Sequence, residues 1–181
     1  MTREEFLEIR RAIPFEEVRL GHSELALLPI AELDGVQILE TGEEDGAWKP
    51  DWFVVGEDCL CGDFIFVDLG NSDLPVFVVP HGEGRWDPDL IASSFGGFIE
   101  ALRVLDRVSK QKRTQVEFAE YPLSRIERGE VLKQIATTIG DAPLAFWELW
   151  LGDPPPRLCS ACRRPIDEGR ACCIFCGGEP A

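Results

Sequence analysis

Three β-rich runs lie close together in the middle of the chain: Trp52-Phe53-Val54-Val55-Gly56, Phe64-Ile65-Phe66-Val67-Asp68-Leu69 and Pro75-Val76-Phe77-Val78-Val79. Each run is rich in β-branched and aromatic residues, which favour strands. The turn Gly70-Asn71-Ser72-Asp73 separates the second run from the third. Intervals this short are typical of hairpins, because a parallel crossover needs a dozen or more residues. The middle of the chain therefore predicts an antiparallel sheet.

The flanking sequence predicts further strands and several helices. Residues 25–28 and 36–39 form short apolar runs of the length expected for strands. The spacing of apolar residues predicts one short helix that ends before Pro14, and further helices over 90–108, 124–139 and 143–151. These elements together predict an α+β fold, in which helices flank a largely antiparallel sheet.

Acidic residues dominate the N-terminal half of the chain. The 181 residues include 33 Asp and Glu against 18 Lys and Arg, for a net charge of −15. Residues 1–102 alone hold 22 acidic and 6 basic side chains. Nucleic acids and anionic membranes would be repelled, because Lys and Arg supply most of the affinity for both. The composition therefore predicts a basic protein as the partner.

The N-terminal sequence predicts where the protein resides. Met1-Thr2-Arg3-Glu4-Glu5-Phe6 contains acids and lacks the apolar segment of a secretory signal. No apolar run approaches the ~20 residues that a membrane-spanning helix needs. A hydrophobic content of 45% is sufficient to bury a core. We therefore expect a globular protein in the cytoplasm.

Two CxxC pairs stand near the C-terminus. Ten residues separate Cys159-Ser160-Ala161-Cys162 from Cys173-Ile174-Phe175-Cys176. Two such pairs can place four thiolates around one zinc ion, with zinc–sulfur bonds of ~2.3 Å. A site closed by four cysteines is structural rather than catalytic. The sequence therefore predicts a structural zinc site made by Cys159, Cys162, Cys173 and Cys176.

Two alternatives to this site remain open. Cys172 could replace Cys173 as a ligand, although only Cys173 restores the CxxC spacing. Disulfides could replace the metal. However, the number of cysteines is odd, at seven, and disulfides are rare in the cytoplasm where we expect this chain, so zinc is favoured. Cys59 and Cys61 lie far from the cluster in sequence, and we interpret them as small, half-buried hydrophobic residues.

A run of prolines divides the chain. Asp153-Pro154-Pro155-Pro156 favours an extended, stiff segment. We expect an α+β domain at 1–152 with a helical extension at its C-terminal end, a linker at 153–156 and a zinc-ribbon tail at 157–181. The tail is too poor in apolar residues to form a core of its own, since its substantial apolar side chains are Leu158, Ile166, Ile174 and Phe175.

The sequence predicts a binding surface rather than an active site. It contains no G-x-S-x-G elbow, Walker loop, HExxH or dinucleotide-binding turn, so no catalytic residue is predicted. An acidic loop with an aromatic anchor is the candidate for partner binding, and it comprises Glu43, Glu44, Asp45, Trp48 and Asp51. The alternative interpretation is a solvated charged loop in which Trp48 packs back on the core.

Residues 52–102 also contain an ordered set of motifs. They are Trp52-Phe53-Val54-Val55-Gly56, Gly62-Asp63-Phe64-Ile65-Phe66-Val67-Asp68, Pro75-Val76-Phe77, His81, Trp86, and Ile91-Ala92-Ser93-Ser94-Phe95 with Phe98 and Leu102. As a set, they resemble the SUKH superfamily, which includes the yeast cell-wall synthesis regulator and many bacterial proteins. The resemblance covers residues 20–105 and implies an α+β fold with a largely antiparallel sheet. It also implies an immunity protein that neutralises a toxin, often a nuclease, from competing cells.

The tail supports a second functional hypothesis. Zinc ribbons often contact nucleic acid. Basic residues occur in the tail and also after the predicted helix over 90–108. They are Arg157, Arg163, Arg164 and Arg170 in the tail, and Lys110, Lys112 and Arg113 after the helix. The chain would then be an adaptor for nucleic acid or for a complex that processes it. Because residues 153–181 have four basic and four acidic side chains, the charge balance disfavours this role.

Overall fold

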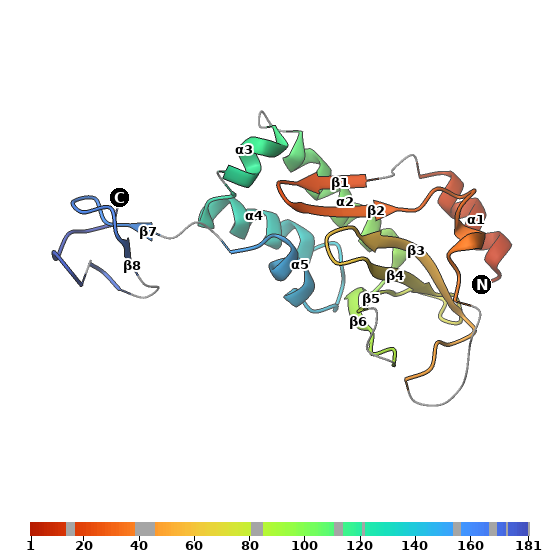
Figure 1. Ribbon diagram of the computed structural model, residues 1–181. Coiled ribbons are helices and arrows are strands. Elements are labelled where there is room, and N and C mark those ends of the chain that lie inside the picture. Colours follow the sequence, from red (N-terminus) through yellow and green to blue (C-terminus); the bar gives the residue numbers. More distant parts are fainter. Residues whose placement is uncertain are drawn as a thin grey trace.

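A six-stranded antiparallel sheet forms the centre of the computed structural model (Figure 1). The structure describes residues 1–13, 17–38, 46–80, 85–110, 114–120, 122–153, 157–166, 170–172 and 174–180. The strands follow one another in chain order and are β1 (Glu17–Leu20), β2 (Ser23–Leu27), β3 (Trp52–Asp58), β4 (Asp63–Asp68), β5 (Val76–Val79) and β6 (Asp89–Ala92). The α+β fold class is confirmed, and all five strand pairs are antiparallel.

Helices cover one face of this sheet. They are α1 (Arg3–Arg11), α2 (Phe95–Ser109), α3 (Gln115–Glu120), α4 (Arg125–Ala136) and α5 (Ala145–Trp150). Capping boxes begin α1 at Thr2 and α4 at Ser124, where each hydroxyl accepts the backbone N–H of the Glu three residues later. None of the described helices combines the length and apolar character that crossing a membrane requires.

The main core lies between the helices and the sheet. Phe6 of α1, Phe98 and Leu102 of α2 and Ile65 of β4 belong to one continuous cluster of buried side chains. Trp147 of α5 is fully buried in the same cluster, and its Nε1 donates to the carbonyl oxygen of Ile91 at 2.9 Å. The short helix α5 is therefore held against the sheet by packing and by a buried hydrogen bond.

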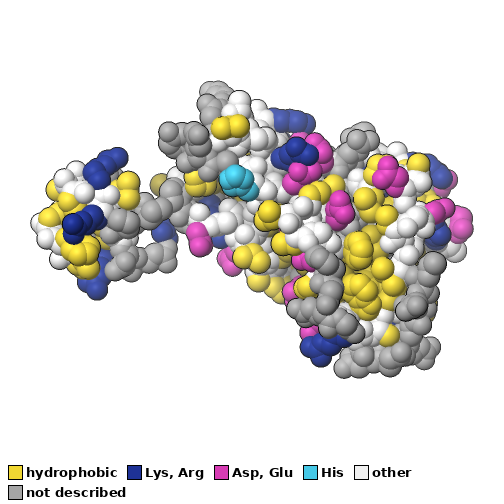
Figure 2. All heavy atoms as spheres, in the orientation of Figure 1, with side chains coloured by type: hydrophobic (Ala, Val, Ile, Leu, Met, Phe, Trp, Pro, Cys, Tyr) yellow, Lys and Arg dark blue, Asp and Glu magenta, His cyan; other side chains and the backbone are white. Residues whose placement is uncertain are grey.

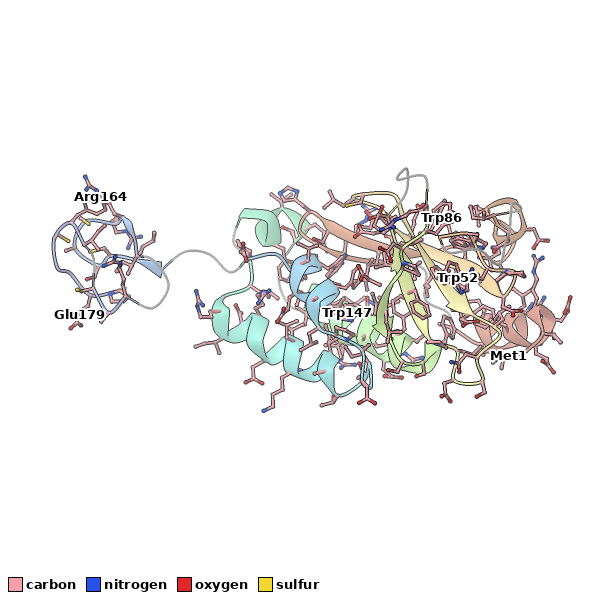
Figure 3. All side chains as sticks on the ribbon, turned by 90° about the horizontal axis from the view of Figure 1, so that it is seen from below. Met1, Trp52, Trp86, Trp147, Arg164 and Glu179 are labelled. Atoms are coloured by element: carbon pink, nitrogen blue, oxygen red, sulfur yellow. The ribbon has the colours of Figure 1, made fainter. Side chains whose placement is uncertain are left out.

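A second, smaller cluster covers the opposite face of the sheet. Trp48, Val54, Phe66 and Val79 are buried there, and half-buried aromatic side chains surround them. Figure 3 shows two of these, Trp52 and Trp86, on the same side of the sheet. Because both faces carry apolar side chains, the central strands read as nearly continuous hydrophobic runs.

Two glycines allow backbones to approach closely. A Cβ at Gly56, where a bulge shifts the β3–β4 register, would collide with the carbonyl oxygen of Ala26 on β2. A Cβ at Gly97 would collide with the carbonyl oxygen of Thr138 after α4. Glycine therefore permits the contacts of β3 with β2 and of α2 with the segment after α4.

Two sequence-based expectations are wrong in detail. Residues 36–38 form no strand; they follow the short 3-10 helix Leu33–Gly35, and Val36 and Ile38 pack on the second face of the sheet. Leu90 and Ile91 belong to β6, and α2 begins only at Phe95, where the Ser94 hydroxyl accepts the N–H of Gly97 at 3.1 Å. Short apolar runs fit either a strand or a helix, so tertiary contacts decide between them.

The C-terminal residues form a small unit of their own, drawn at the left of Figure 1. It contains a two-stranded antiparallel sheet made by β7 (Arg157–Leu158) and β8 (Pro165–Ile166). An isolated bridge pairs Cys159 with Pro180, so the segment around Pro180 returns to the residue that directly follows β7. Of the linker predicted at 153–156, residues 154–156 lie outside the described part of the chain.

Candidate metal centre and acidic surface

Three cysteines of the tail lie together. The Sγ atoms of Cys159, Cys162 and Cys176 are all within 4.8 Å of one another, and those of Cys159 and Cys176 are 3.4 Å apart. Thiolates arranged as a tetrahedron around zinc are about 3.8 Å apart, given a bond length of ~2.3 Å. A disulfide would require about 2.05 Å. The three side chains therefore fit a shared metal ion better than a disulfide.

The local backbone positions these sulfurs. Cys159 follows β7, and its N–H donates to the carbonyl oxygen of Arg164 at 2.9 Å, which closes the turn that contains Cys162. Ser160 donates its N–H to the carbonyl oxygen of Glu179, and Gly177 has a φ of +70° directly after Cys176. The two ends of the tail are thereby brought together around the cluster.

The backbone passes close to the sulfur atoms at Gly178. A Cβ at Gly178 would lie 2.8 Å from the Sγ of Cys159 and 3.4 Å from that of Cys176. A larger residue at this position would press against both sulfurs. Glycine at this position therefore lets the chain pass beside the two sulfurs without a clash.

Electrostatics prepare Cys159 to act as a thiolate ligand. The pKa of its thiol falls from 9.0 to about 6, chiefly because the backbone N–H of Cys162 points at the sulfur. The N–H of Ala161 and the neighbouring thiols lower this pKa further, against the opposing effect of burial. A thiolate is the form that binds metal, so the geometry and the pKa favour the same chemistry.

The fourth predicted ligand, Cys173, lies outside the described residues. Its rival Cys172 is described and exposed, and it is not a member of the cluster found among the described residues. The cysteine cluster near the C-terminus thus contains three of the four cysteines that were predicted to bind zinc. The identity of the fourth ligand stays a prediction.

The prediction that Trp48 is an exposed aromatic anchor of the partner-binding loop is wrong. Trp48 is only 2% exposed, and its ring packs against Trp52, Phe66 and Trp86 with centroids 4.9 to 5.3 Å apart. Its Nε1 donates to the carbonyl oxygen of Trp52 at 3.1 Å. Trp48 is therefore a core residue of the second face, not an exposed anchor.

The acidic members of that loop remain untested as binding residues. Glu43, Glu44 and Asp45 lie outside the described part of the chain. Asp51 is exposed, and its carboxylate lies beside Gly70 in the turn after β4. The loop prediction therefore keeps only Asp51 among the described residues.

A different acidic group lies where β3 turns into β4. Strand register places Asp58 directly opposite Asp63 and beside Leu25, and it places Asp89 opposite Val78. Glu24 and Glu57 approach the same turn from the other side of the sheet, close to the Cys59 thiol. We call Glu24, Glu57, Asp58, Asp63 and Asp89 the acidic end of the sheet.

Titration of groups in the turn reflects this concentration of charge. Burial, followed by the carboxylates of Glu24 and Glu57, raises the pKa of the Cys59 thiol from 9.0 to about 11. The pKa of Asp58 is also raised, first by burial and then by Asp63, against the hydrogen bond that Leu60 donates. Sequence reasoning missed this group, because the opposition of Asp58 and Asp63 depends on the hairpin register.

Comparisons with protein-family models, with curated proteins and with solved structures find no match for this chain. No relative therefore assigns a role to the cysteine cluster or to the acidic end of the sheet. The function is inferred below from the residues and geometry of the chain itself.

Proposed function

We propose that this chain is a non-catalytic protein-binding domain of the immunity type, which neutralises a basic, nuclease-like toxin through the acidic end of its sheet. One observation carries the proposal: Asp58 and Asp63 face each other across neighbouring strands, with Asp89 on the same side of the sheet. Like charges directly opposite each other destabilise a sheet. A basic partner would relieve that repulsion.

The distribution of charge over the chain supports the same role. Figure 2 shows acidic side chains mainly on the larger unit, while basic ones are prominent on the tail. A strongly acidic surface raises the association rate with a basic protein and disfavours acidic competitors. The resemblance to the SUKH superfamily points to toxins as the class of partner, and the substrate groove of a nuclease is basic because it binds phosphates.

Zinc is the metal that suits the tail best. Cys159, Cys162 and Cys176 supply soft thiolate ligands, and Cys173 would complete a closed set of four cysteines. Such a site has no open position for a substrate, so its role is to hold the tail folded. Zinc therefore acts as a structural component beside the binding domain.

A pull-down with matched variants tests the binding function. The bait is the zinc-loaded chain, and the test variant removes three charges through Glu57→Gln, Asp63→Asn and Asp89→Asn. A control variant removes three exposed charges elsewhere through Asp73→Asn, Glu130→Gln and Asp141→Asn. We expect one stoichiometric basic protein, whose toxicity the bait suppresses, to bind the parent and the control but not the test variant. Equal binding by all three would contradict the proposal.

The nucleic-acid adaptor remains a second candidate because of one feature of the tail. The guanidinium of Arg164 lies 4.4 Å above the ring of Phe175, which is 62% exposed. An exposed aromatic ring beside an arginine can stack on unpaired bases. Fluorescence anisotropy with a single-stranded 20-mer at 150 mM salt tests this role, and binding lost in Phe175→Ala would favour the adaptor.

A further inference from the structure

A pocket opens on the helix-covered side of the sheet, at its acidic end. Its volume is about 310 Å³, which is at the lower limit for small-ligand sites. Apolar walls come from two strands and from α5, namely Val78, Leu90, Phe146 and Leu149. Three carboxylates also line the pocket, and they belong to Asp58, Asp63 and Asp89. The pocket therefore combines apolar walls with negatively charged side chains.

Strand register explains why three aspartates meet here. Asp58 pairs with Leu25 and Asp63, and Leu25 and Ile65 face the helix-side core, so both carboxylates project from that face of the sheet. Asp89 pairs with Val78, another member of the same core. Trp147 anchors α5 to β6 at Ile91, and Ala145, Phe146 and Leu149 of the same helix line the pocket.

We propose that this pocket receives an arginine side chain of a protein partner, together with an apolar residue next to it. Arginine combines an apolar stem with a cationic end, which matches a lining that contains both apolar side chains and carboxylates. Its planar fork can engage two carboxylates at once, whereas the compact ammonium of lysine acts as a point charge. The proposal rests on the proposed binding function and names the chemical group that is recognised.

Two exposed leucines, one lining the pocket and one in the turn between Asp58 and Asp63, indicate where the neighbouring residue would bind. Leu149 of α5 is 83% exposed and Leu60 in the β3–β4 turn is 66% exposed. Exposed leucines next to an acidic pocket are typical of an interface in which apolar and charged contacts alternate. The partner segment is therefore expected to place an aliphatic side chain beside the arginine.

The test uses two dipeptides that differ only in charge. N-acetyl-leucyl-arginine amide is titrated into the full zinc-loaded chain, and the isosteric citrulline dipeptide is the control. Methyl NMR signals of Val78, Leu90 and Leu149 report binding at the pocket. We expect the arginine dipeptide to shift these signals in a saturable manner, with at least tenfold weaker binding of the citrulline dipeptide.

Variants locate the effect within the pocket. Asp63→Asn and Asp89→Asn should each weaken binding of the arginine dipeptide several-fold, while Asp73→Asn removes an equal charge from an exposed turn and should not. Asparagine has nearly the same shape as aspartate, and unchanged methyl spectra without peptide would show that the variants are folded. Equal affinity of the two dipeptides, or equal effects of the three variants, would overturn the proposal.

Other occupants have distinct signatures. Shifts of the same methyl signals caused by MgCl2 alone would show a metal site, and shifts that follow protein concentration would show a second copy of the chain. Either result would overturn the proposal. If a basic toxin binds in the pull-down but the arginine dipeptide leaves the pocket unchanged, the arginine proposal fails while the binding function stands.

Discussion

The sheet unit and the cysteine-rich tail are held together by different physical means. Residues of α1, α2, α4, α5 and the sheet share one continuous apolar cluster, whereas the buried cluster of the tail consists of Cys159 and Ile166. Apolar burial can stabilise the larger unit, but the two side chains that are buried among the described residues of the tail cannot order a segment of this length. We therefore expect the tail to depend on a metal ion for its fold and the sheet unit to fold without one.

The cysteines of the two units show the same contrast in their chemistry. The pKa of Cys59 is raised to about 11 beside carboxylates, and the pKa of Cys159 is lowered to about 6 by backbone N–H groups. The same residue type is thus harder to ionise in the sheet unit and easier to ionise in the tail. The surroundings of each cysteine, rather than its presence, determine its role.

Removal of the metal is expected to have the largest effect and to separate the two units most clearly. A structural zinc contributes ~10–16 kcal/mol to the folding of such a site, so chelation or Cys159→Ser should unfold the tail. Amide hydrogen exchange should show loss of protection in residues 157–180, with the sheet unit unchanged. Cys59→Ser is the control and should keep its zinc; a protected tail without metal would contradict the comparison.

The fourth ligand can be identified with two neighbouring variants. Cys173→Ser should reduce zinc content and tail protection almost as strongly as Cys159→Ser, because it would remove one of four thiolates. Cys172→Ser should leave both unchanged, since Cys172 lies outside the cysteine cluster. Zinc content measured by a colorimetric chelator distinguishes them. The opposite result would assign the ligand to Cys172.

Trp147→Ala should destabilise only the sheet unit. Removing this buried ring and its hydrogen bond to Ile91 is expected to cost ~3–5 kcal/mol in the free energy of unfolding. Urea denaturation measures this cost, and zinc content should not change. Leu149→Ala, two residues away but 83% exposed, should change stability by less than ~0.5 kcal/mol. A similar loss in both variants would argue against the placement of α5.

Alkylation should reveal the electrostatic contrast as a difference in rate. With a pKa of about 11 for Cys59, the thiolate fraction at pH 8 is about 10⁻³, roughly a hundredfold below that of an unperturbed cysteine. Iodoacetamide labelling followed by mass spectrometry should therefore be slow at Cys59 and should accelerate up to pH 11. The double variant Glu24→Gln, Glu57→Gln should speed labelling at pH 8. Labelling that levels off near pH 9 would contradict the raised pKa.

The smallest expected effect concerns the like-charge pair in the sheet. Asp63→Asn removes the repulsion with Asp58 and should stabilise the sheet unit by ~0.2–1 kcal/mol at neutral pH. Thermal unfolding measures the shift, and the gain should disappear at acidic pH, because the pKa of Asp58 is raised and its protonation removes the repulsion. Asp73→Asn provides the comparison in an exposed turn. Destabilisation by Asp63→Asn would show that the interactions of this carboxylate within the chain outweigh its repulsion with Asp58.

Local sequence patterns predicted the parts of the fold that depend on neighbouring residues. The runs that became β3, β4 and β5 alternate with turns, and the helices α4 and α5 begin and end close to the expected positions. The strand β1 and the helix α3 were not predicted, because both are short and lack a distinctive periodicity. The prediction of the boundary between β6 and α2 was wrong for the same reason, since a strand of four residues is too short to show a periodicity.

The candidate sites also differ in whether local sequence patterns could predict them. CxxC spacing alone predicted the tail cluster, because ligands close together in sequence reach one ion through tight turns. The position of Trp48 and the opposition of Asp58 and Asp63 depend on how strands pair and on what covers the second face of the sheet. The sequence by itself determined the α+β class, the excess of negative charge and the cysteine cluster, since these follow from composition and local spacing. Only the tertiary structure decided where that charge is concentrated, because strand register brings together residues whose separation in sequence carries no signal.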